Sequence, residues 1–104
     1  MERLAFKMKL SPGQLNEYKK RHDEIWLELQ NLLRGAGVHD YSIFFDDETH
    51  YLFATMKVDD AKCLDQLSQD PLMKKWWTFM KDIMAVNHDH SPVSHALKEV
   101  FHLP

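Results

Sequence analysis

The sequence has little cysteine and no excess of basic residues. Cys63 is the single cysteine among 104 residues, so no disulfide can form within the chain and a disulfide-held secreted domain is excluded. A reducing compartment, the cytoplasm, is the expected location. Thirteen Lys and Arg against sixteen Asp and Glu give a formal net charge of −3. Because no basic excess is present to neutralise phosphates, we expect no nucleic-acid partner.

Long apolar runs and several catalytic motifs are also missing. No run approaches the roughly eighteen apolar residues of a membrane span, and residues 1–7 mix charged with apolar side chains, unlike a signal peptide. We therefore expect no membrane partner. The sequence has no glycine-rich phosphate loop, nucleophile elbow or CxxC pair. The motifs that usually support phosphoryl transfer, acyl transfer and dithiol redox chemistry are therefore absent from the sequence.

The composition is that of a globular protein, with 44% hydrophobic, 12% aromatic and 28% charged residues. A chain of this length can bury about two-thirds of its surface, which is enough for one core. No linker, repeat or low-complexity segment divides it. We expect a single domain over residues 1–104.

Hydrophobic periodicity predicts the order of the elements. Ser11, Pro12 and Gln14 have the spacing of a capping box, which predicts that the first helix begins there, and Gly35 and Gly37 are expected to end it. The predicted elements are a strand over 3–10, a helix over 12–33 that can bend, hairpin strands over 41–45 and 50–58, a helical region over 61–83 broken near Ser68, a loop over 87–92 and a strand over 96–103.

This order predicts an α+β fold of the ferredoxin-like class, in which a four-stranded antiparallel sheet carries its helices on one face. The second face of the sheet is then uncovered. Phe44, Tyr51 and Phe53 fall on that face and make it too aromatic to remain in water. We therefore expect a homodimer that closes face on face or edge to edge.

Tyr18 and His22 are the first candidate functional pair. They lie four residues apart on the apolar stripe of a predicted helix, where a phenol and an imidazole need partners or must line a cavity. A core histidine bonded to a backbone carbonyl is one interpretation of His22. A catalytic one is the other, because an imidazole exchanges protons near neutral pH.

Trp76 and Trp77 are the second candidate pair. Neighbours on a helix point about 100° apart, so both cannot occupy the centre of one apolar stripe, and one ring should lie at its margin. An indole there suits a sugar, because its flat ring stacks on C–H groups and its N–H donates a hydrogen bond. A wide apolar face continued by the neighbouring methionines is the alternative.

A metal site is the weaker interpretation of the histidines near the C-terminus. These are His88, His90, His95 and His102, of which the first two could form a ligand pair. Zinc sites normally add a third or fourth ligand at helical or knuckle spacing and a second shell, and a solvated loop explains His-Asp-His equally well. Cys63 has no thiolate-stabilising motif around it. We expect no metal and no nucleophilic cysteine.

Several ordered segments together resemble the L-rhamnose mutarotase family over essentially the whole chain. They are Glu17-Tyr18, Arg21-His22, Ile25-Trp26, Glu28-Leu29, Tyr41-Ser42-Ile43, Leu52-Phe53-Ala54, Trp76-Trp77 with Met80 and Met84, Ser91-Pro92-Val93-Ser94, Glu99-Val100-Phe101 and Leu103-Pro104. The resemblance implies a cofactor-free, cytoplasmic enzyme that forms a dimeric α+β barrel and interconverts the α and β anomers of L-rhamnose.

The resemblance also implies site residues. The family's general acid aligns with His22, and the residues that line its sugar align with Tyr18, Tyr41, Trp76 and Trp77. The chemistry agrees, because mutarotation needs only proton transfers at the anomeric hydroxyl and the ring oxygen. We expect His22 to shuttle the proton, with Tyr18 as its orienting neighbour and the tryptophans as a stacking platform.

Two other functions stay open at this point. A small ferredoxin-like dimer can be a haem- or quinone-handling monooxygenase, in which an apolar cavity with one histidine holds a large planar ligand. The chain could also be a sugar-binding dimer without catalysis. The sequence does not decide among L-rhamnose, L-fucose and L-lyxose as the sugar, because hydroxyl orientation is read by hydrogen-bond geometry.

Overall fold

Four antiparallel strands form one sheet in the computed structural model, which describes residues 1–104. The spatial order is β2-β3-β1-β4, so the N-terminal strand lies inside the sheet. The strands are β1 (Glu2–Lys9), β2 (Val38–Phe45), β3 (Tyr51–Val58) and β4 (Ser94–Leu97). The predicted α+β, ferredoxin-like arrangement is confirmed.

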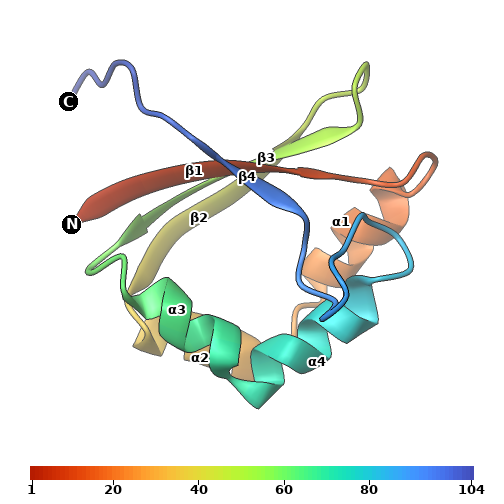
Figure 1. Cartoon of the computed structure of the whole chain (residues 1–104), viewed down its shortest axis with the longest axis horizontal. Coiled ribbons are helices and arrows are strands. Elements are labelled where there is room, and N and C mark those ends of the chain that lie inside the picture. The colour runs from red at the N-terminus through yellow and green to blue at the C-terminus, as the bar shows by residue number, and fades with distance from the viewer.

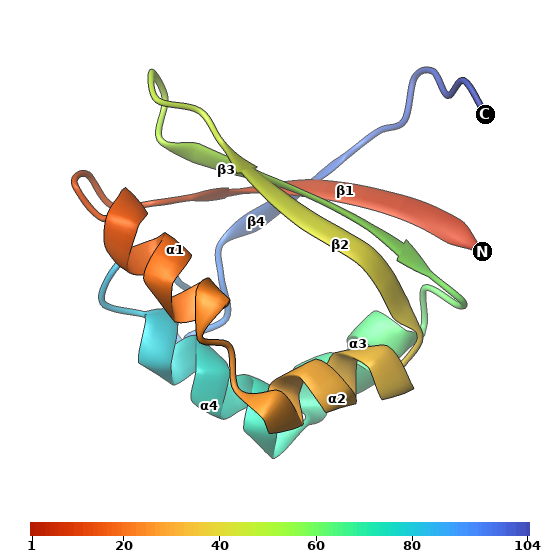
Figure 2. The ribbon, with the colours of Figure 1, turned by 180° about the vertical axis from the view of Figure 1, so that it is seen from behind.

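All helices lie on one side of this sheet (Figure 1). They are α1 (Leu15–Asp23), α2 (Leu27–Gly35), α3 (Cys63–Gln69) and α4 (Pro71–Met80). Seen from behind, α1 and α2 run along the β2 side of the molecule, with α3 and α4 behind them (Figure 2). None of these helices has the length and apolar character needed to cross a bilayer.

Alternation along the inner strands builds the core. Met8 of β1 faces Leu52 of β3, and Phe6 faces Ala54, all under the helices. Met8, Leu52 and Ala54 are almost fully buried. Each large apolar side chain removed from water contributes about 1.5–3 kcal/mol, so this face of the sheet fixes the register.

The opposite face of the sheet carries the aromatic residues expected there. Phe44 of β2 lies directly opposite Phe53 of β3, and Phe44 is 64% exposed. The ammonium groups of Lys7 and Lys9 lie 4.5 and 4.4 Å from the centre of the Tyr51 ring. No helix covers this face (Figure 1).

The first helix begins later than the capping-box spacing predicts. It starts at Leu15, and Gln14 precedes it without a side-chain cap. Gly13 has φ +78°, a left-handed conformation that no α-helix contains. Residues 11–14 are therefore a turn, and the prediction of a start at Pro12 is wrong.

The predicted bend of this helix is a complete break. The helix α1 ends at Asp23, and α2 begins after Trp26, whose ψ of 133° is extended. The backbone N–H groups of Glu24 and Ile25 donate to the carbonyls of Lys20 and His22, which closes the last turn of α1. The end of α2 at Gly35, with Gly37 at φ +92°, agrees with the sequence.

The helical region after the hairpin is divided as expected, with the break two residues beyond Ser68. Asp70 ends α3 and caps α4, its carboxylate accepting the N–H of Leu72 at 2.8 Å. Pro71 occupies the first turn of α4, where its missing N–H is no loss. Ile83 lies in the turn that follows the helix, so the predicted end of this region is too late.

The last strand is much shorter than predicted. It spans Ser94–Leu97 and pairs with Met8 to Ala5 of β1, and residues 98–104 form no strand. Alternation of apolar residues continues to Leu103, but Val100, Phe101 and Leu103 are exposed and contact no core. A period of two in the sequence is compatible with a strand, but a strand forms only where a neighbouring strand accepts and donates its backbone hydrogen bonds.

A β-bulge in β2 reverses the faces of that strand. His39 pairs with Lys57 but Ser42 pairs with Thr55, so Asp40 and Tyr41 together oppose one residue of β3. Asp40 is the residue with left-handed backbone, at φ +47°. The extra residue turns Tyr41, Ile43 and Phe45 toward the helices.

The bulge predicts a difference between two substitutions of Asp40. Asp40→Asn removes the ion pair with Lys57 but keeps a residue type that tolerates left-handed backbone, and we expect a change within about 0.5 kcal/mol. Asp40→Val loses the same ion pair and adds backbone strain, so we expect a loss of about 1–3 kcal/mol. Urea unfolding of both variants measures the difference. Equal stability would show that this position carries no strain.

Candidate functional site

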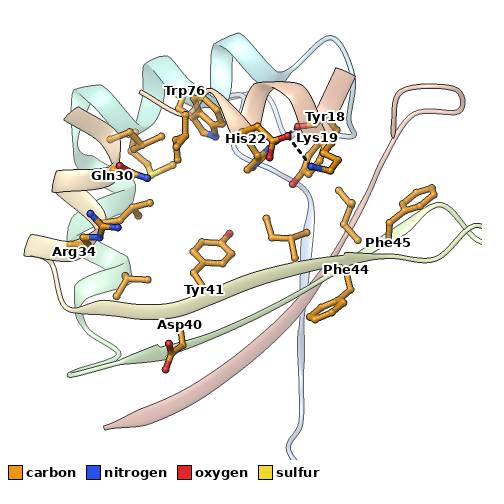
Figure 3. Close-up of a pocket in the computed structure, with 18 of the residues that line it drawn as sticks. Tyr18, Lys19, His22, Gln30, Arg34, Asp40, Tyr41, Phe44, Phe45 and Trp76 are labelled. Atoms are coloured by element: carbon orange, nitrogen blue, oxygen red, sulfur yellow. Dashed lines mark hydrogen bonds and ion pairs between the residues drawn. The ribbon is translucent and has the colours of Figure 1, made fainter. Parts of the chain in front are cut away.

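A cavity of about 940 Å³ lies between the helices α1 and α2 and the inner face of β2 (Figure 3). Its walls are mostly hydrophobic, with polar side chains at both ends. Tyr18, His22, Tyr41 and Trp76, four of the five residues singled out from the sequence, line it. Trp77 does not line it; this residue is partly buried and packs against the main core.

Helical spacing stacks Tyr18 and His22 on the cavity side of α1. Their ring centres are 4.3 Å apart, with the planes inclined by 29°. The next ring is Trp76 of α4, which meets the imidazole edge-on at 5.4 Å. The imidazole is thus held between a phenol face and an indole.

A main-chain hydrogen bond decides the tautomer of His22. Its Nδ1 lies 3.0 Å from the carbonyl oxygen of Tyr18, one helical turn earlier. A carbonyl only accepts, so Nδ1 carries the proton and donates it. In the neutral ring, Nε2 then holds the free lone pair.

Burial keeps this imidazole neutral. It lowers the pKa of His22 below the ordinary 6.5, and the hydrogen bond to Tyr18 and the charge of Asp23 oppose this effect more weakly. At neutral pH the group therefore presents a proton acceptor to the cavity. It becomes a donor only after it has taken a proton.

Two tyrosines that line this cavity, Tyr18 and Tyr41, keep their hydroxyl protons. Tyr41 projects from β2 toward His22 and Trp76, while Phe44 and Asp40 point to the other side of the sheet (Figure 3). Burial raises the pKa of Tyr41 to about 12, although 39% of the residue is exposed along the open cavity. The pKa of Tyr18 is raised even more than that of Tyr41. Burial is the larger cause, and the charge that Tyr41 carries when ionised is the smaller one. Both hydroxyls are hydrogen-bond donors at physiological pH.

Sequence reasoning did not find several polar residues of the cavity. Gln30 and Arg34, one turn apart on α2, form its other end (Figure 3). Lys19 and Asp23 also line it, joined by an ion pair of 2.8 Å. The spacing of Gln30 and Arg34 by four residues was a usable signal, since it places both on one helix face.

His88 and His90 lie in a loop that contains no cluster of metal ligands. Nδ1 of His90 is 3.0 Å from the hydroxyl of Thr78, and the carboxylate of Asp89 accepts the N–H of Ser91 at 3.0 Å. No group of three or more His, Cys, Asp or Glu in the structure could hold a metal ion. Cys63 is buried and makes no disulfide.

Comparison with known proteins identifies the family. A model of L-rhamnose mutarotases matches residues 3–103. The chain belongs to the L-rhamnose mutarotase family. Its relatives include L-rhamnose mutarotases of Formosa agariphila, 55% identical over 99% of both chains, and of Brucella anthropi, 53% identical over 99% of this chain and 97% of the other.

Solved structures agree with this family and show that the same fold also occurs outside it. The crystal structure of an L-rhamnose mutarotase from Formosa agariphila covers all of both chains with a TM-score of 0.93 at 54% identity. An antibiotic biosynthesis monooxygenase covers 96% of this chain and 99% of its own, with a TM-score of 0.62 at 10% identity. That second likeness shows the fold alone. The mutarotase family thus holds over the monooxygenase alternative.

The tautomer and burial of His22 predict how it titrates in this mutarotase-family protein. Among the seven histidines, the imidazole resonance that disappears in His22→Gln should titrate below pH 6.5, because the charged ring is poorly solvated. Proton NMR over pH 4–9 measures this. A midpoint at or above 6.5 would contradict a buried, neutral base.

Proposed function

We propose that this protein interconverts the α and β anomers of L-rhamnose and that His22 moves the proton. One observation carries the proposal: a neutral imidazole whose Nε2 has no hydrogen-bond partner lines a cavity together with an indole and two protonated tyrosines. Sugars are bound by such mixtures of flat apolar rings and donors. The family of the chain gives the sugar and the class of reaction, an isomerisation.

The reaction needs two proton transfers on one molecule. Nε2 of His22 takes the proton of the anomeric hydroxyl, while the protonated hydroxyl of Tyr41 gives its proton to the ring oxygen. The bond between C1 and the ring oxygen breaks, and C1 becomes an aldehyde. Rotation about the C1–C2 bond exposes the other carbonyl face. The reverse transfers then close the ring as the other anomer. No electrons leave the sugar, so no electron carrier takes part.

Each neighbour of His22 has a part in this proposal. Tyr18 orients the imidazole through its carbonyl and its stacked ring. We assign to Tyr41, which projects across the cavity toward His22 (Figure 3), the proton transfer to the ring oxygen. Trp76 is the apolar platform for the C–H face of the pyranose. Contact of Trp77 with the sugar stays a prediction from the sequence.

Removing the imidazole tests the reaction. We expect His22→Gln to lower the rate of anomer exchange by about 10²–10⁴-fold, because a positioned acid or base contributes that much. Saturation-transfer NMR on L-rhamnose measures the rate, with L-fucose and L-lyxose as comparison sugars. Circular dichroism checks that the variant is folded, and Lys20→Met, on the exposed side of α1, is the control.

The outcomes of this experiment separate the possible functions. Full exchange in His22→Gln would remove His22 from the reaction. A wild-type protein that shifts the rhamnose resonances on titration but leaves exchange at the buffer rate would be a sugar-binding dimer. Since the lowered pKa keeps the imidazole a base down to below pH 6.5, catalysis should persist through neutral pH and decline only on the acid side of 6.5.

A homodimer in the cytoplasm is part of the same proposal. The outer face of the sheet, defined by Phe44, Tyr51 and Phe53, is open in the single chain and too apolar to face water. A second copy that packs its own outer face on this one would complete a dimeric α+β barrel. Cys63, buried and unpaired, supports a reducing compartment.

A charge in this face should separate the protomers. Phe44→Glu would bury a carboxylate opposite Phe53, so we expect it to give a monomer where the wild type is a dimer. Leu27→Glu is the matched control, because Leu27 is 67% exposed on α2, on the helical side. Light scattering after size exclusion gives the masses. A monomeric wild type, or a dimeric Phe44→Glu, would contradict the proposal.

A further inference from the structure

His22 occupies a helical turn that receives no support from a continuing helix. The helix α1 ends one residue later, at Asp23, and three non-helical residues separate it from α2. A continuous helix would fix the direction of this turn through its hydrogen-bond ladder. Here the orientation of the turn relative to α4 must come from a tertiary contact.

Arg21 supplies such a contact from the same turn. Its Nη1 and Nη2 bind both carboxylate oxygens of Asp82, at 2.8 and 3.1 Å. Nη1 also donates to the carbonyl of Phe79 at 2.8 Å, and Nε binds Glu17 at 2.8 Å. The side chain is only 12% exposed. A planar guanidinium with these partners holds one geometry, unlike a flexible surface ion pair.

Two of the partners of Arg21, Phe79 and Asp82, lie at and just beyond the C-terminal end of α4, the helix that also carries Trp76. A positive charge at a helix C-terminus is favourable, because the last carbonyls lack helical partners. The guanidinium lies 4.6 Å from the ring centre of Phe79, and that ring lies 5.6 Å from Trp76. Trp76 in turn meets His22 edge-on.

Trp26 closes the same cluster from the break between the helices. Its ring is 5.1 Å from Trp76 and 5.6 Å from Phe79. The two ends of the break are therefore held on α4 in different ways, by Arg21 before it and by an apolar ring after it.

We propose that Arg21 is a positioning residue, which clamps the last turn of α1 to the end of α4 and so fixes the imidazole of His22 relative to Trp76. It does not line the cavity, so we expect it to act on the sugar only through His22. This inference rests on the role proposed above for His22. Displacement of a reacting group by about 1 Å can cost 10²-fold in rate, so the clamp acts on kcat.

The test compares four variants in the saturation-transfer assay. Arg21→Met keeps much of the side-chain length without charge or donors, and we expect kcat to fall about 10–100-fold with KM changed less than about threefold. Arg21→Lys keeps the positive charge but cannot bind both carboxylate oxygens of Asp82 with two parallel N–H groups, and it should retain part of kcat. Asp82→Asn weakens the same clamp from α4 and should lower kcat in the same direction. Lys20→Met, its neighbour on α1, should leave kcat unchanged.

A spectroscopic readout distinguishes positioning from general destabilisation. Trp76, edge-on to His22, shifts the imidazole protons by its ring current. In Arg21→Met these resonances should move toward their positions in Trp76→Phe, at temperatures far below unfolding. Lys20→Met should leave them in place.

The possible failures are distinguishable. If Arg21→Met is folded and keeps the wild-type kcat while His22→Gln is inactive, Arg21 does not position the site and the proposed function stands. If Arg21→Met does not fold, Asp82→Asn decides, and a folded Asp82→Asn with full kcat and unmoved His22 resonances overturns the inference. If His22→Gln itself keeps full exchange, the proposed function fails first.

Discussion

The hydrogen bond between Nδ1 of His22 and the carbonyl of Tyr18 constrains the whole candidate site. Because a carbonyl can only accept, it fixes which nitrogen of the ring is protonated, and because both groups lie on one helical turn, it fixes where Nε2 points. Burial then keeps the ring neutral. The stacked ring of Tyr18 and the edge of Trp76 limit rotation of the imidazole. In the proposed reaction, the other parts of the site bring the sugar to that nitrogen.

Two departures from regular backbone make room for this site. The break between α1 and α2 allows the two helices to follow different directions along the β2 side of the cavity, while the bulge at Asp40 turns Tyr41 inward. A regular β2 with Val38 still inside would place Tyr41 on the outer face and Phe44 on the inner one. Local irregularities of this kind concentrate where a fold carries out its function. Here both of them line the same cavity.

The two faces of the sheet have separate tasks. The inner face, under the helices, carries the core and one wall of the cavity. The outer face carries Phe44, Phe53 and Tyr51, with two lysines over the Tyr51 ring. Alternation along the strands allows this separation, since a change on one face leaves the other face nearly untouched. The proposed dimer and the proposed reaction therefore depend on different side chains of the same strands.

Local spacing alone determined the pairing of Tyr18 with His22, the division of the second helical region near Ser68, the order of the elements and the aromatic outer face, because each depends on residues close in sequence or on a strict period. Tertiary structure decided the rest. A left-handed Gly13 delays α1, an extra residue at Asp40 aims Tyr41, and the lack of a neighbouring strand leaves residues 98–104 unpaired. It also joined Arg21 to Asp82, which are 61 positions apart. Periodicity shows which face of an element is apolar, but the partner that covers this face, and the polar groups that meet there, depend on how distant segments pack.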